Sequence, residues 1–395
     1  MDCMRKKILV LTTSLSSGGI TSFTVNLVNM LAKDHDITLL YTQDKNDRLR
    51  RFCPSVDFLQ YKYPNKYLTV LYMLLKGWGK HLIKIKYRDH NRVTPMESIQ
   101  RMAYAQAMNV RLPNITKKTT YDIAISTAEF FCNDVVAFKV KSKRKVAWIH
   151  PDYKALEADV LFDRITLDCF DNIVSVSKST RQSLIDCIPE YDTKALYIPN
   201  LLDTKMIKEN GVRIPKEYKA IDNKHIIVTV CRMDNSSKRL DRIIPIVKKL
   251  IEHKQNIIWY IVGDGPDYQL MKDLVTKNNL QEYVVLLGNR NNPYPYIKNA
   301  NVFVLVSQYE GKPVVVDEAL ELCCPVITTR YTSADEQVTP ECGIIIENND
   351  MTIAEEFCSV LDWKHLNEIK KFLELNDYGE SINQVFESQI AKVLG

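Results

Sequence analysis

Short apolar runs of strand length alternate with helix-like patterns through both halves of the chain, and this alternation restricts the fold more than any other feature. Near the start, a strand-like run at 8–11 is followed by apolar residues at helical spacing from Phe23 to Leu31, and then by a second strand-like run at 37–41. Such alternation predicts parallel sheets with helices on both faces. We expect further strands at 122–126, 146–149, 173–176, 195–198, 226–231, 257–262, 284–287, 302–306, 326–328 and 343–346.

The 395 residues are enough for two domains of ordinary size. A polar connection at about 200–219 separates the two alternating series. We therefore predict an α/β protein with two Rossmann-like, doubly wound parallel-sheet domains that face a cleft. The first domain is expected at 1–205 and the second at 206–375, and 376–395 should form a helix that returns to the first domain.

The composition is that of a globular protein with sizeable cores, since 46% of the residues are hydrophobic. The net charge of +5 is mild and does not indicate a nucleic-acid partner. No C-x-x-C pair occurs among the ten cysteines, and no signal peptide is recognisable, so we expect reduced thiols in a cytoplasmic protein. No apolar run approaches the length of a transmembrane helix.

The stretch 307–329 has the sequence of a tight loop, a helix and a strand, and it follows the expected strand at 302–306. Gly311 and Pro313 end that strand, and helical apolar spacing begins at Val314. The free N–H groups at the start of such a helix suit a phosphate. The carboxylates of Glu310 and Glu318 would repel a phosphate but can hold hydroxyl groups, so the pattern predicts a site for a sugar phosphate.

Three more loops in the second half follow predicted strands and should meet at the same sheet edge. Arg232 and Lys238 follow the first strand, Gly263 and Asp264 the second, and Arg290 the third. Arg offers bidentate contacts and Lys a point charge, so together with the helix start they predict a diphosphate site. The alternative interpretation, that Arg232 and Lys238 are ordinary surface residues, remains open from the residues alone.

Two features of the first half could face the same ligand. Gly18 and Gly19 lie in the loop after the first strand, where α/β proteins bind phosphates, but without the spacing of a dinucleotide fingerprint. The glycines could equally serve backbone angles alone. His150 directly follows a predicted strand, which places it at the ligand edge of the sheet, although a lone histidine can also be structural.

Residues 60–92 interleave aromatic and aliphatic side chains with lysine and arginine. Such a segment suits an anionic membrane surface. A helix packed on its own domain with solvated lysines is the alternative. The membrane interpretation predicts a peripheral protein on the inner face of the cytoplasmic membrane.

Glu310-Gly311-Lys312-Pro313 through Glu318 forms a Glu-x7-Glu spacing, which resembles the signature of retaining, nucleotide-sugar-dependent glycosyltransferases with the GT-B fold. These are enzymes of the glycosyltransferase family 4 type, particularly those that build bacterial capsule, lipopolysaccharide and teichoic-acid glycans. The resemblance covers nearly the whole chain. Other motifs in the expected order are Gly18-Gly19, His150, Val174-Ser175-Val176-Ser177, Pro199-Asn200, Arg232 with Lys238, Gly263-Asp264-Gly265-Pro266 and Pro325-Val326-Ile327.

The resemblance implies a role for each of these residues. Glu310 would hold hydroxyls of the donor sugar and Glu318 those of the ribose, while His150 would contact the donor sugar near its 6-position. The implied catalytic residues are Glu310, Arg232, Lys238 and His150, and the implied donor-binding residues are Gly18, Gly19, Gly263, Asp264, Arg290, Gly311, Lys312, Pro313, Val314 and Glu318.

Two positions depart from the family pattern. Lys312 stands where the family usually has an apolar or aromatic residue, and Cys323 stands where it usually has glycine just past the helix end. Glycine there allows a left-handed cap, so cysteine implies either another cap geometry or mild strain.

The implied reaction moves a sugar from a nucleoside diphosphate, UDP in the leading interpretation, to a glycan or polyprenyl-linked acceptor with retention of configuration. It needs no cofactor or metal, because Arg232 and Lys238 carry the positive charge. Two alternatives stay open: a nucleotide-sugar epimerase on the same fold, and a non-catalytic partner of a glycan assembly complex.

Overall fold

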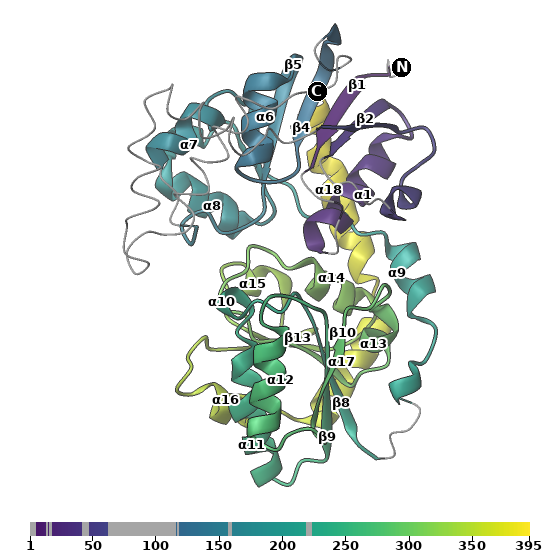
Figure 1. Ribbon diagram of the computed structural model, residues 1–395, viewed down its shortest axis with the longest axis vertical. Coiled ribbons are helices and arrows are strands. Elements are labelled where there is room, and N and C mark those ends of the chain that lie inside the picture. Colours follow the sequence, from purple (N-terminus) through teal and green to yellow (C-terminus); the bar gives the residue numbers. More distant parts are fainter. Residues whose placement is uncertain are drawn as a thin grey trace. The chain divides into compact units, whose positions relative to one another are not determined.

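The computed structural model describes residues 5–12, 15, 18–41, 47–61, 116, 118–156, 160–218 and 223–395. These form two compact units (Figure 1). The second unit is Leu202–Val385, and the first unit joins the chain up to Leu201 with Phe386–Gly395. The last helix, α18 (Tyr378–Leu394), therefore begins in the second unit and ends in the first.

The first unit contains a seven-stranded sheet with the order β3-β2-β1-β4-β5-β6-β7, in which every pairing is parallel. The strand order reverses between β1 and β4, and such a switch point is where open α/β sheets bind ligands. The strands are β1 (Lys7–Leu11), β2 (Asp36–Tyr41), β3 (Asp57–Gln60), β4 (Tyr121–Ser126), β5 (Ser142–Ile149), β6 (Asn172–Ser175) and β7 (Ala195–Tyr197).

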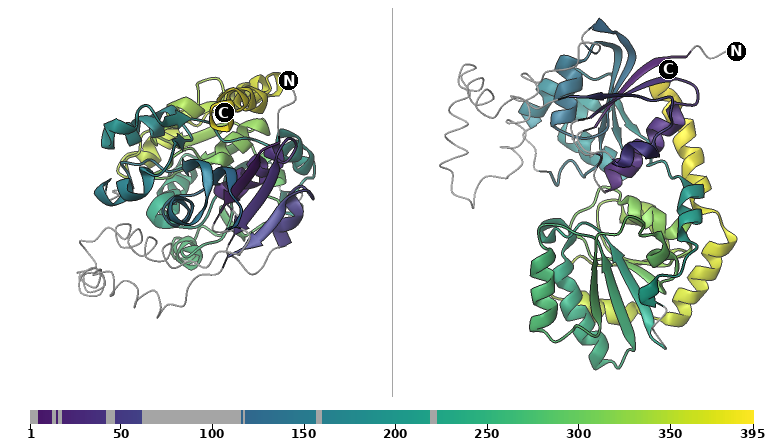
Figure 2. Two further views of the ribbon diagram at one scale, coloured as in Figure 1. Left: turned by 90° about the horizontal axis from the view of Figure 1, so that it is seen from above. Right: turned by 45° about the vertical axis from the view of Figure 1, so that its right-hand side comes forward.

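Strand β1 shows how the apolar sequence creates two cores in this unit, since alternate side chains point to opposite faces. Leu9 and Leu11 belong to one buried cluster, and Ile8 and Val10 belong to the other. The first cluster packs under α6 (Phe131–Lys139), α7 (Val160–Leu167) and α8 (Lys178–Cys187), and the second under α1 (Gly19–Leu31) and the end of α18 (Figure 2). Short 3-10 turns occupy Asp47–Arg51 and Pro189–Tyr191.

The second unit contains a six-stranded parallel sheet with the order β10-β9-β8-β11-β12-β13, which reverses between β8 and β11. Every residue of β9 is buried, as expected for a strand covered on both faces. The strands are β8 (His225–Val230), β9 (Ile257–Val262), β10 (Val284–Gly288), β11 (Val302–Leu305), β12 (Val326–Thr329) and β13 (Gly343–Ile346).

Helices cover both faces of this second sheet (Figure 1 and Figure 2). One face carries α11 (Ile243–Glu252), α12 (Tyr268–Lys277) and α16 (Ile353–Val360), and the other carries α13 (Tyr294–Lys298) and α14 (Val314–Glu321). The remaining elements are α9 (Thr204–Gly211), α10 (Asn235–Lys238), α15 (Ala334–Gln337), α17 (Trp363–Leu375) and 3-10 turns at Lys216–Tyr218 and Leu240–Arg242.

The predicted fold class is confirmed, and each predicted strand is present with its ends displaced by at most a few residues. The segment 200–219, predicted as a polar connection between the domains, contains α9, whose first turn is capped by the Asp203 carboxylate. Strand β3 was not predicted. The segment 60–92 lies outside the described residues except for Gln60 and Tyr61. In the described part of the chain, no helix has both the length and the apolar character needed to cross a membrane.

Candidate active site

The loop between β11 and α14 presents the start of a helix at the switch point of the second sheet. Pro313 has an extended backbone and precedes the helix, which begins at Val314. The first N–H groups of any α-helix have no partner within the helix and carry the positive end of its dipole. Val314 therefore has a free N–H at the start of α14, and Gly311 and Lys312 lie in the loop directly before it, a position that suits a phosphate.

Glu310 and Lys238 form an ion pair at the edge of this loop. The Nζ of Lys238 lies 2.5 Å from Oε1 of Glu310, and the two side chains are only 21% and 10% exposed. Ser307 Oγ also donates to Oε1 of Glu310 at 2.7 Å. Burial by itself lowers the pKa of Lys238, but the Glu310 carboxylate outweighs burial and the net pKa is raised. Lys238 is therefore charged at neutral pH.

The two loops that carry this pair are joined by a buried arginine. Arg242 is 3% exposed, and its guanidinium donates to the carbonyl of Val306 at 2.9 Å and to Asp350 at 2.7 Å. Its third contact is the side-chain oxygen of Gln308. The backbone N–H of Gln308 in turn donates to the carbonyl of Ser237 at 2.8 Å. These contacts fix the spacing between Lys238 and Glu310.

The loop after β9 lies against the loop after β8 at a distance that only glycine allows. A Cβ at Gly263 would lie 1.9 Å from the carbonyl oxygen of Cys231, and one at Gly265 would lie 2.3 Å from that of Met233. Gly263 also has φ +143°, which disfavours other residues. The neighbouring Asp264 is exposed, and its carboxylate accepts from the N–H of Gly265 at 2.7 Å.

Arg232 and Arg290 differ in their surroundings. Arg232 is exposed, and its guanidinium makes no ion pair or side-chain hydrogen bond with other described residues. Arg290 is held by Glu217 at 3.2 Å and by the hydroxyl of Tyr296 at 3.1 Å. Arg232 can therefore turn toward an anion at little cost, whereas Arg290 would have to share its charge with Glu217.

Glu318 lies in α14, as predicted, and is largely buried. The hydroxyl of Tyr294 on α13 donates to its Oε1 at 3.1 Å. This contact fixes the position of the Glu318 carboxylate on α14, the helix that follows the loop of Glu310.

Lys312, the first departure from the family pattern, has a buried side chain that is 5% exposed. Its Nζ lies 3.9 Å from Oδ2 of Asp317, which is fully buried. The other carboxylate oxygen of Asp317 accepts from Gln337 at 2.7 Å and from the hydroxyl of Tyr378 at 2.9 Å. Lys312 is therefore part of a buried polar network beneath the loop.

Cys323, the second departure, adopts the left-handed backbone with φ +57°. Its N–H donates to the carbonyl of Leu320, and the N–H of Cys324 donates to that of Ala319, both at 2.9 Å. This is the Schellman geometry that ends many helices. Of the two expectations, a different cap geometry was wrong, and cysteine occupies the glycine conformation.

In the first unit, His150 follows β5 and is held by the loop after β4. Its backbone N–H donates to Glu129, and its Nε2 lies 3.0 Å from the carbonyl of Thr127. A carbonyl can only accept, so Nε2 carries the proton and Nδ1 is left as an acceptor. Burial lowers the pKa of His150, so the ring is neutral at pH 7.

Gly18 and Gly19 mark the start of α1 in the first unit. Gly18 is the residue before the helix and has φ +149°, and Gly19 is its first residue. No side chain among the described residues caps this helix start, so the first N–H groups of α1 have no partner within the helix.

Several partners of the candidate residues were not predicted from the sequence. Asp317, Gln337 and Tyr378 lie far apart in the chain, and no local pattern links them. Glu129 follows β4 and could have been found by the rule that marked His150, since both residues stand after adjacent parallel strands.

Within the described ranges, no three side chains of His, Cys, Asp or Glu come together in a way that could hold a metal ion. The nine cysteines that the structure covers, all but Cys3, are free thiols.

The part of the chain that carries this site resembles a known protein family. Residues 213–372 match the model of the family described as glycosyl transferases group 1. This match lies within the second unit and covers less than half of the chain. The matched residues include Arg232, Lys238, Glu310 and Glu318, so the ion pair and the loop before α14 both lie in the matched region.

The relatives that this chain matches share only about a quarter of its residues in the aligned regions. An uncharacterised glycosyltransferase of Methanocaldococcus jannaschii is 26% identical over 218 residues, which are 52% of this chain and 53% of that protein. The Campylobacter jejuni N-acetylgalactosamine-N,N'-diacetylbacillosaminyl-diphospho-undecaprenol 4-alpha-N-acetylgalactosaminyltransferase is 22% identical over 349 residues, 87% of this chain and 86% of that enzyme. Except for the latter, the chain spans about half the length of the first curated relatives it matches.

The crystal structure of Anabaena HepE in complex with UDP and glucose has the same architecture. The TM-score is 0.67 with 14% identity, and the match covers 99% of both chains. Together with the two parallel sheets, this likeness shows that the chain has the GT-B fold.

Proposed function

We propose that this protein is a retaining glycosyltransferase that moves a sugar from a nucleoside diphosphate, in the first instance UDP, to a glycan or lipid-linked glycan acceptor. The acceptor would belong to a bacterial surface polysaccharide such as a capsule, O-antigen or cell-wall glycan. The observation that carries the proposal is the Lys238–Glu310 ion pair beside the start of α14, inside the region that matches the group 1 family. The bacterial relatives that act on lipid-linked or capsular glycans support the choice of acceptor.

In this proposal the donor diphosphate binds at the helix start and beside Lys238. Negative charge grows on the diphosphate as the bond to the sugar breaks, and fixed positive groups stabilise that charge. Lys238 has three donors and gives one to Glu310, so the others are available to phosphate oxygens. Arg232 supplies a second charge, so the reaction needs no metal.

Glu310 would hold the donor sugar with the oxygen that faces away from Lys238. Its Oε1 already accepts from Lys238 and Ser307, while Oε2 has no hydrogen-bond partner in the described part of the chain. Glu318 would hold the ribose, and Nδ1 of His150 would accept from a hydroxyl of the donor sugar. Retention of configuration would follow without a covalent nucleophile, and the leaving phosphate would take the proton of the acceptor hydroxyl. A glycosyl adduct trapped on Glu310 would contradict this part of the proposal.

The test begins with a panel of UDP-, GDP- and ADP-sugars, scored by thermal shift and then by transfer to a polyprenyl-diphosphate-linked glycan. Lys238→Met should lower kcat by about 100- to 1,000-fold, the loss typical of one well-placed donor. Lys249→Met is the matched control, since Lys249 forms its ion pair with Glu355 on the surface of the same unit. Equal activity of Lys238→Met and wild type would refute a catalytic site here, and a new sugar nucleotide formed without acceptor would indicate an epimerase.

We further propose that the protein binds the anionic inner face of the cytoplasmic membrane through 60–92, which rests on the sequence alone. Replacing Lys76, Lys80, Lys84 and Lys86 with glutamine should release the protein from anionic liposomes. Unchanged binding would refute the membrane role.

A further inference from the structure

Gln337 lies on α15, and its side-chain amide binds two residues at the start of α14. The side chain is only 1% exposed. Its Nε2 donates to the carbonyl of Pro313 at 3.0 Å and to Oδ1 of Asp317 at 2.7 Å. Pro313 directly precedes α14 and Asp317 stands in its first turn, so one buried amide holds the start of this helix from the protein interior. The proposed function gives Gln337 no role.

The orientation of this amide is fixed by a third contact. Tyr331 is 4% exposed, and its hydroxyl donates to Oε1 of Gln337 at 2.7 Å. The carbonyl of Pro313 and the carboxylate of Asp317 accept hydrogen bonds but do not donate them, so the two hydrogens of Nε2 must face them. Turning the amide over would lose all three contacts at once. Gln337 therefore presents both donors to the start of α14 in a single arrangement.

The contact with Pro313 also determines the direction of the first N–H of α14. The Pro313 carbonyl accepts from Gln337 and from the N–H of Val316, both at 3.0 Å. The peptide bond between Pro313 and Val314 is trans, so its carbonyl and its N–H point in opposite directions. Because the carbonyl is directed to Gln337, the Val314 N–H is directed away from the buried network. This N–H is one that the helix itself leaves without a partner.

The opposite end of the same loop is held by a different buried side chain. Arg242 binds the side-chain oxygen of Gln308 there, and Gln337 binds Pro313 at the start of the helix. A loop that only has to join β11 to α14 does not need a buried side chain at each end. Donors that are held in place before a ligand arrives stabilise its charge well, because they need no reorganisation. The two contacts therefore indicate that the direction of the N–H groups in this loop matters.

We propose that Gln337 is a positioning residue for the donor diphosphate. It does not touch the donor, but it holds the Val314 N–H in the direction from which a phosphate oxygen binds it. The identification of the phosphate as that of a sugar nucleotide rests on the proposed function, whereas the direction of the N–H does not. Gln337 should therefore affect the binding of phosphate groups and leave the binding of the nucleoside unchanged.

Inorganic pyrophosphate, UDP and uridine are the probes, and their affinities for the full-length protein are measured by NMR titration with isotope-labelled valine. The Val314 amide signal is identified by its loss in Val314→Ile, and pyrophosphate and UDP should both shift it. Gln337→Met keeps an unbranched side chain of similar length but has no donors. It should weaken the binding of pyrophosphate and UDP by about tenfold or more, the effect of one hydrogen bond to a charged group, and leave uridine unchanged. A general loss of structure would weaken all three ligands.

Tyr331→Phe is a second variant that tests the same contact without removing the amide. It keeps both donors of Gln337 but releases the amide oxygen, so pyrophosphate binding should weaken by a smaller factor than in Gln337→Met. If Gln337→Met does not fold, Tyr331→Phe decides the question, and unchanged pyrophosphate affinity in this variant would overturn the inference.

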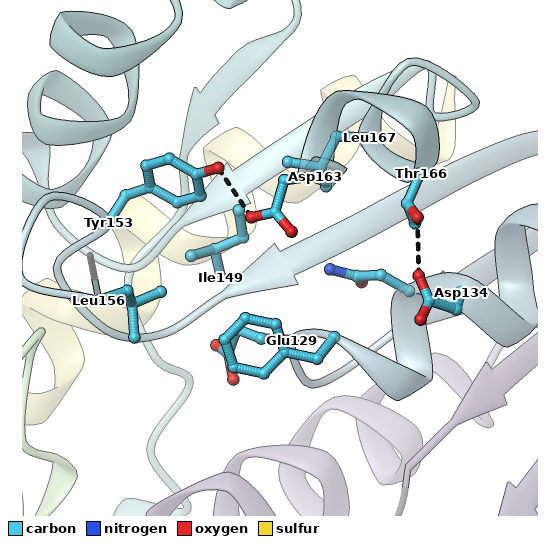
Figure 3. Close-up of a pocket in the computed structure, with 10 residues that line it drawn as sticks. Glu129, Asp134, Ile149, Tyr153, Leu156, Asp163, Thr166 and Leu167 are labelled. Atoms are coloured by element: carbon cyan, nitrogen blue, oxygen red, sulfur yellow. Dashed lines mark hydrogen bonds between the residues drawn. The ribbon is translucent and has the colours of Figure 1, made fainter. Parts of the chain in front are cut away.

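Each variant has a matched control in which a similar contact is removed elsewhere. Gln255→Met also removes a side-chain amide from the second unit, where Gln255 accepts from the indole of Trp363 at 3.0 Å. Gln255 stands before β9, at the end of the sheet opposite to the loop. Tyr153→Phe removes a buried hydroxyl from the first unit, where Figure 3 shows Tyr153 directed to Asp163, at 2.7 Å. Both controls should bind pyrophosphate as the wild type does.

Three results for the folded proteins would overturn the inference. These are an unchanged affinity of Gln337→Met for pyrophosphate, an equal loss of affinity for uridine, and a Val314 amide in the wild type that responds to neither pyrophosphate nor UDP. Failure of the wild type to transfer sugar from any nucleotide sugar, with pyrophosphate binding weakened in Gln337→Met, would instead contradict the proposed function. Gln337 would then remain the positioning residue of a phosphate site.

Discussion

Gly263 shows how strongly a single residue of the site is constrained, because its neighbour leaves no room for a Cβ. The new methyl group of Gly263→Ala would lie 1.9 Å from a backbone oxygen that belongs to the loop of Arg232 and Lys238. We expect a loss of about 3 kcal/mol or more in the free energy of unfolding, measured by urea denaturation. Donor binding should weaken as well, because the two loops must separate.

Gly288→Ala is the matched control for this prediction. Gly288 has φ +68° but no atom within 4 Å of the position of its Cβ. The substitution therefore carries only the cost of the left-handed backbone, about 1 kcal/mol. Equal losses for the two variants would show that backbone angle, and not the contact between loops, sets the requirement at Gly263.

Lys312 is predicted to stabilise the loop from below. Lys312→Leu would leave the buried Asp317 carboxylate without its nearest cation, and loss of one partner of a buried pair costs about 3–5 kcal/mol. Asp317→Asn in the same chain should recover part of this loss, because its Oδ1 can still accept from Gln337 and Tyr378. Urea unfolding of the two single variants and the double variant measures the coupling, and strictly additive effects would contradict it.

Asp134 should make stability depend on pH. Burial, together with the nearby Asp163 carboxylate, raises the pKa of Asp134 from its ordinary value of 3.8 to about 8. Between these two pH values the folded chain holds the proton more tightly than the unfolded chain, so the stability present below about pH 4 is lost as the pH rises toward 8. Asp134→Asn removes this dependence. The difference in unfolding free energy between the variant and wild type should grow by up to a few kcal/mol from pH 5 to pH 8, and parallel pH profiles would contradict the prediction.

At the scale of elements, the unit of strand, loop and helix from β11 to α14 could be predicted because its signals are local. An apolar run, a Gly–Pro break and helical spacing stand in order at 302–321. The edge strand β3 escaped prediction because none of its residues is fully buried, so its sequence lacks the apolar run. Helix α9 escaped because its polar sequence buries only Ile207 and Gly211.

The charged residues of the candidate site could likewise be predicted from their places after strands, but their partners could not. Arg232, Lys238 and Glu310 each follow a strand, which a sequence pattern reveals. The pairing of Asp317 with Tyr378 and the contact of Gln337 with Pro313 depend on packing between segments that are distant in the chain. Single-sequence periodicity carries no information on such contacts.

The end of α14 provides a prediction at this scale. Cys323 holds the left-handed position of the Schellman motif, where a side chain costs about 1–2 kcal/mol relative to glycine. Cys323→Gly should therefore stabilise the second unit by up to about 1 kcal/mol, after the greater freedom of glycine in the unfolded chain is subtracted. Cys323→Val should destabilise it, because a β-branched residue tolerates this conformation least. The free energy of unfolding is measured in urea. A value for Cys323→Val equal to or higher than that of the wild type would show that the cap conformation is not strained.

At the scale of the whole molecule, the last helix contributes to the cores of both units. Its first turn lies in the second unit, where Tyr378 donates to Asp317 and the N–H of Gly379 donates to the buried Glu321 carboxylate at 2.7 Å. Its last turns lie in the first unit, where Phe386, Ile390 and Val393 are buried in the cluster that includes Phe23 of α1. Each unit therefore depends on its own part of the same helix.

Phe386→Ala should destabilise the first unit selectively. Truncation of a fully buried phenylalanine typically costs 3–5 kcal/mol, and the cavity would open beside α1 and β1. Hydrogen exchange should therefore accelerate for the amides of α1 and β1 and stay unchanged for those of β9 and β11 in the second sheet. Tyr378→Phe is the reciprocal variant, and it should accelerate exchange around α14 while leaving β1 protected.

Leu375→Ala is the control for both variants, since Leu375 is 86% exposed near the end of α17 and its truncation should change stability by no more than about 0.5 kcal/mol.

Removal of residues 386–395 should affect only the first unit, because it takes three buried apolar side chains from the first core and none from the second. The truncated chain should retain exchange protection and nucleotide-sugar binding in the second unit while its first unit loses protection. Simultaneous loss of protection in both sheets would show that the two units unfold as one, and would contradict the assignment of each half of α18 to a separate core.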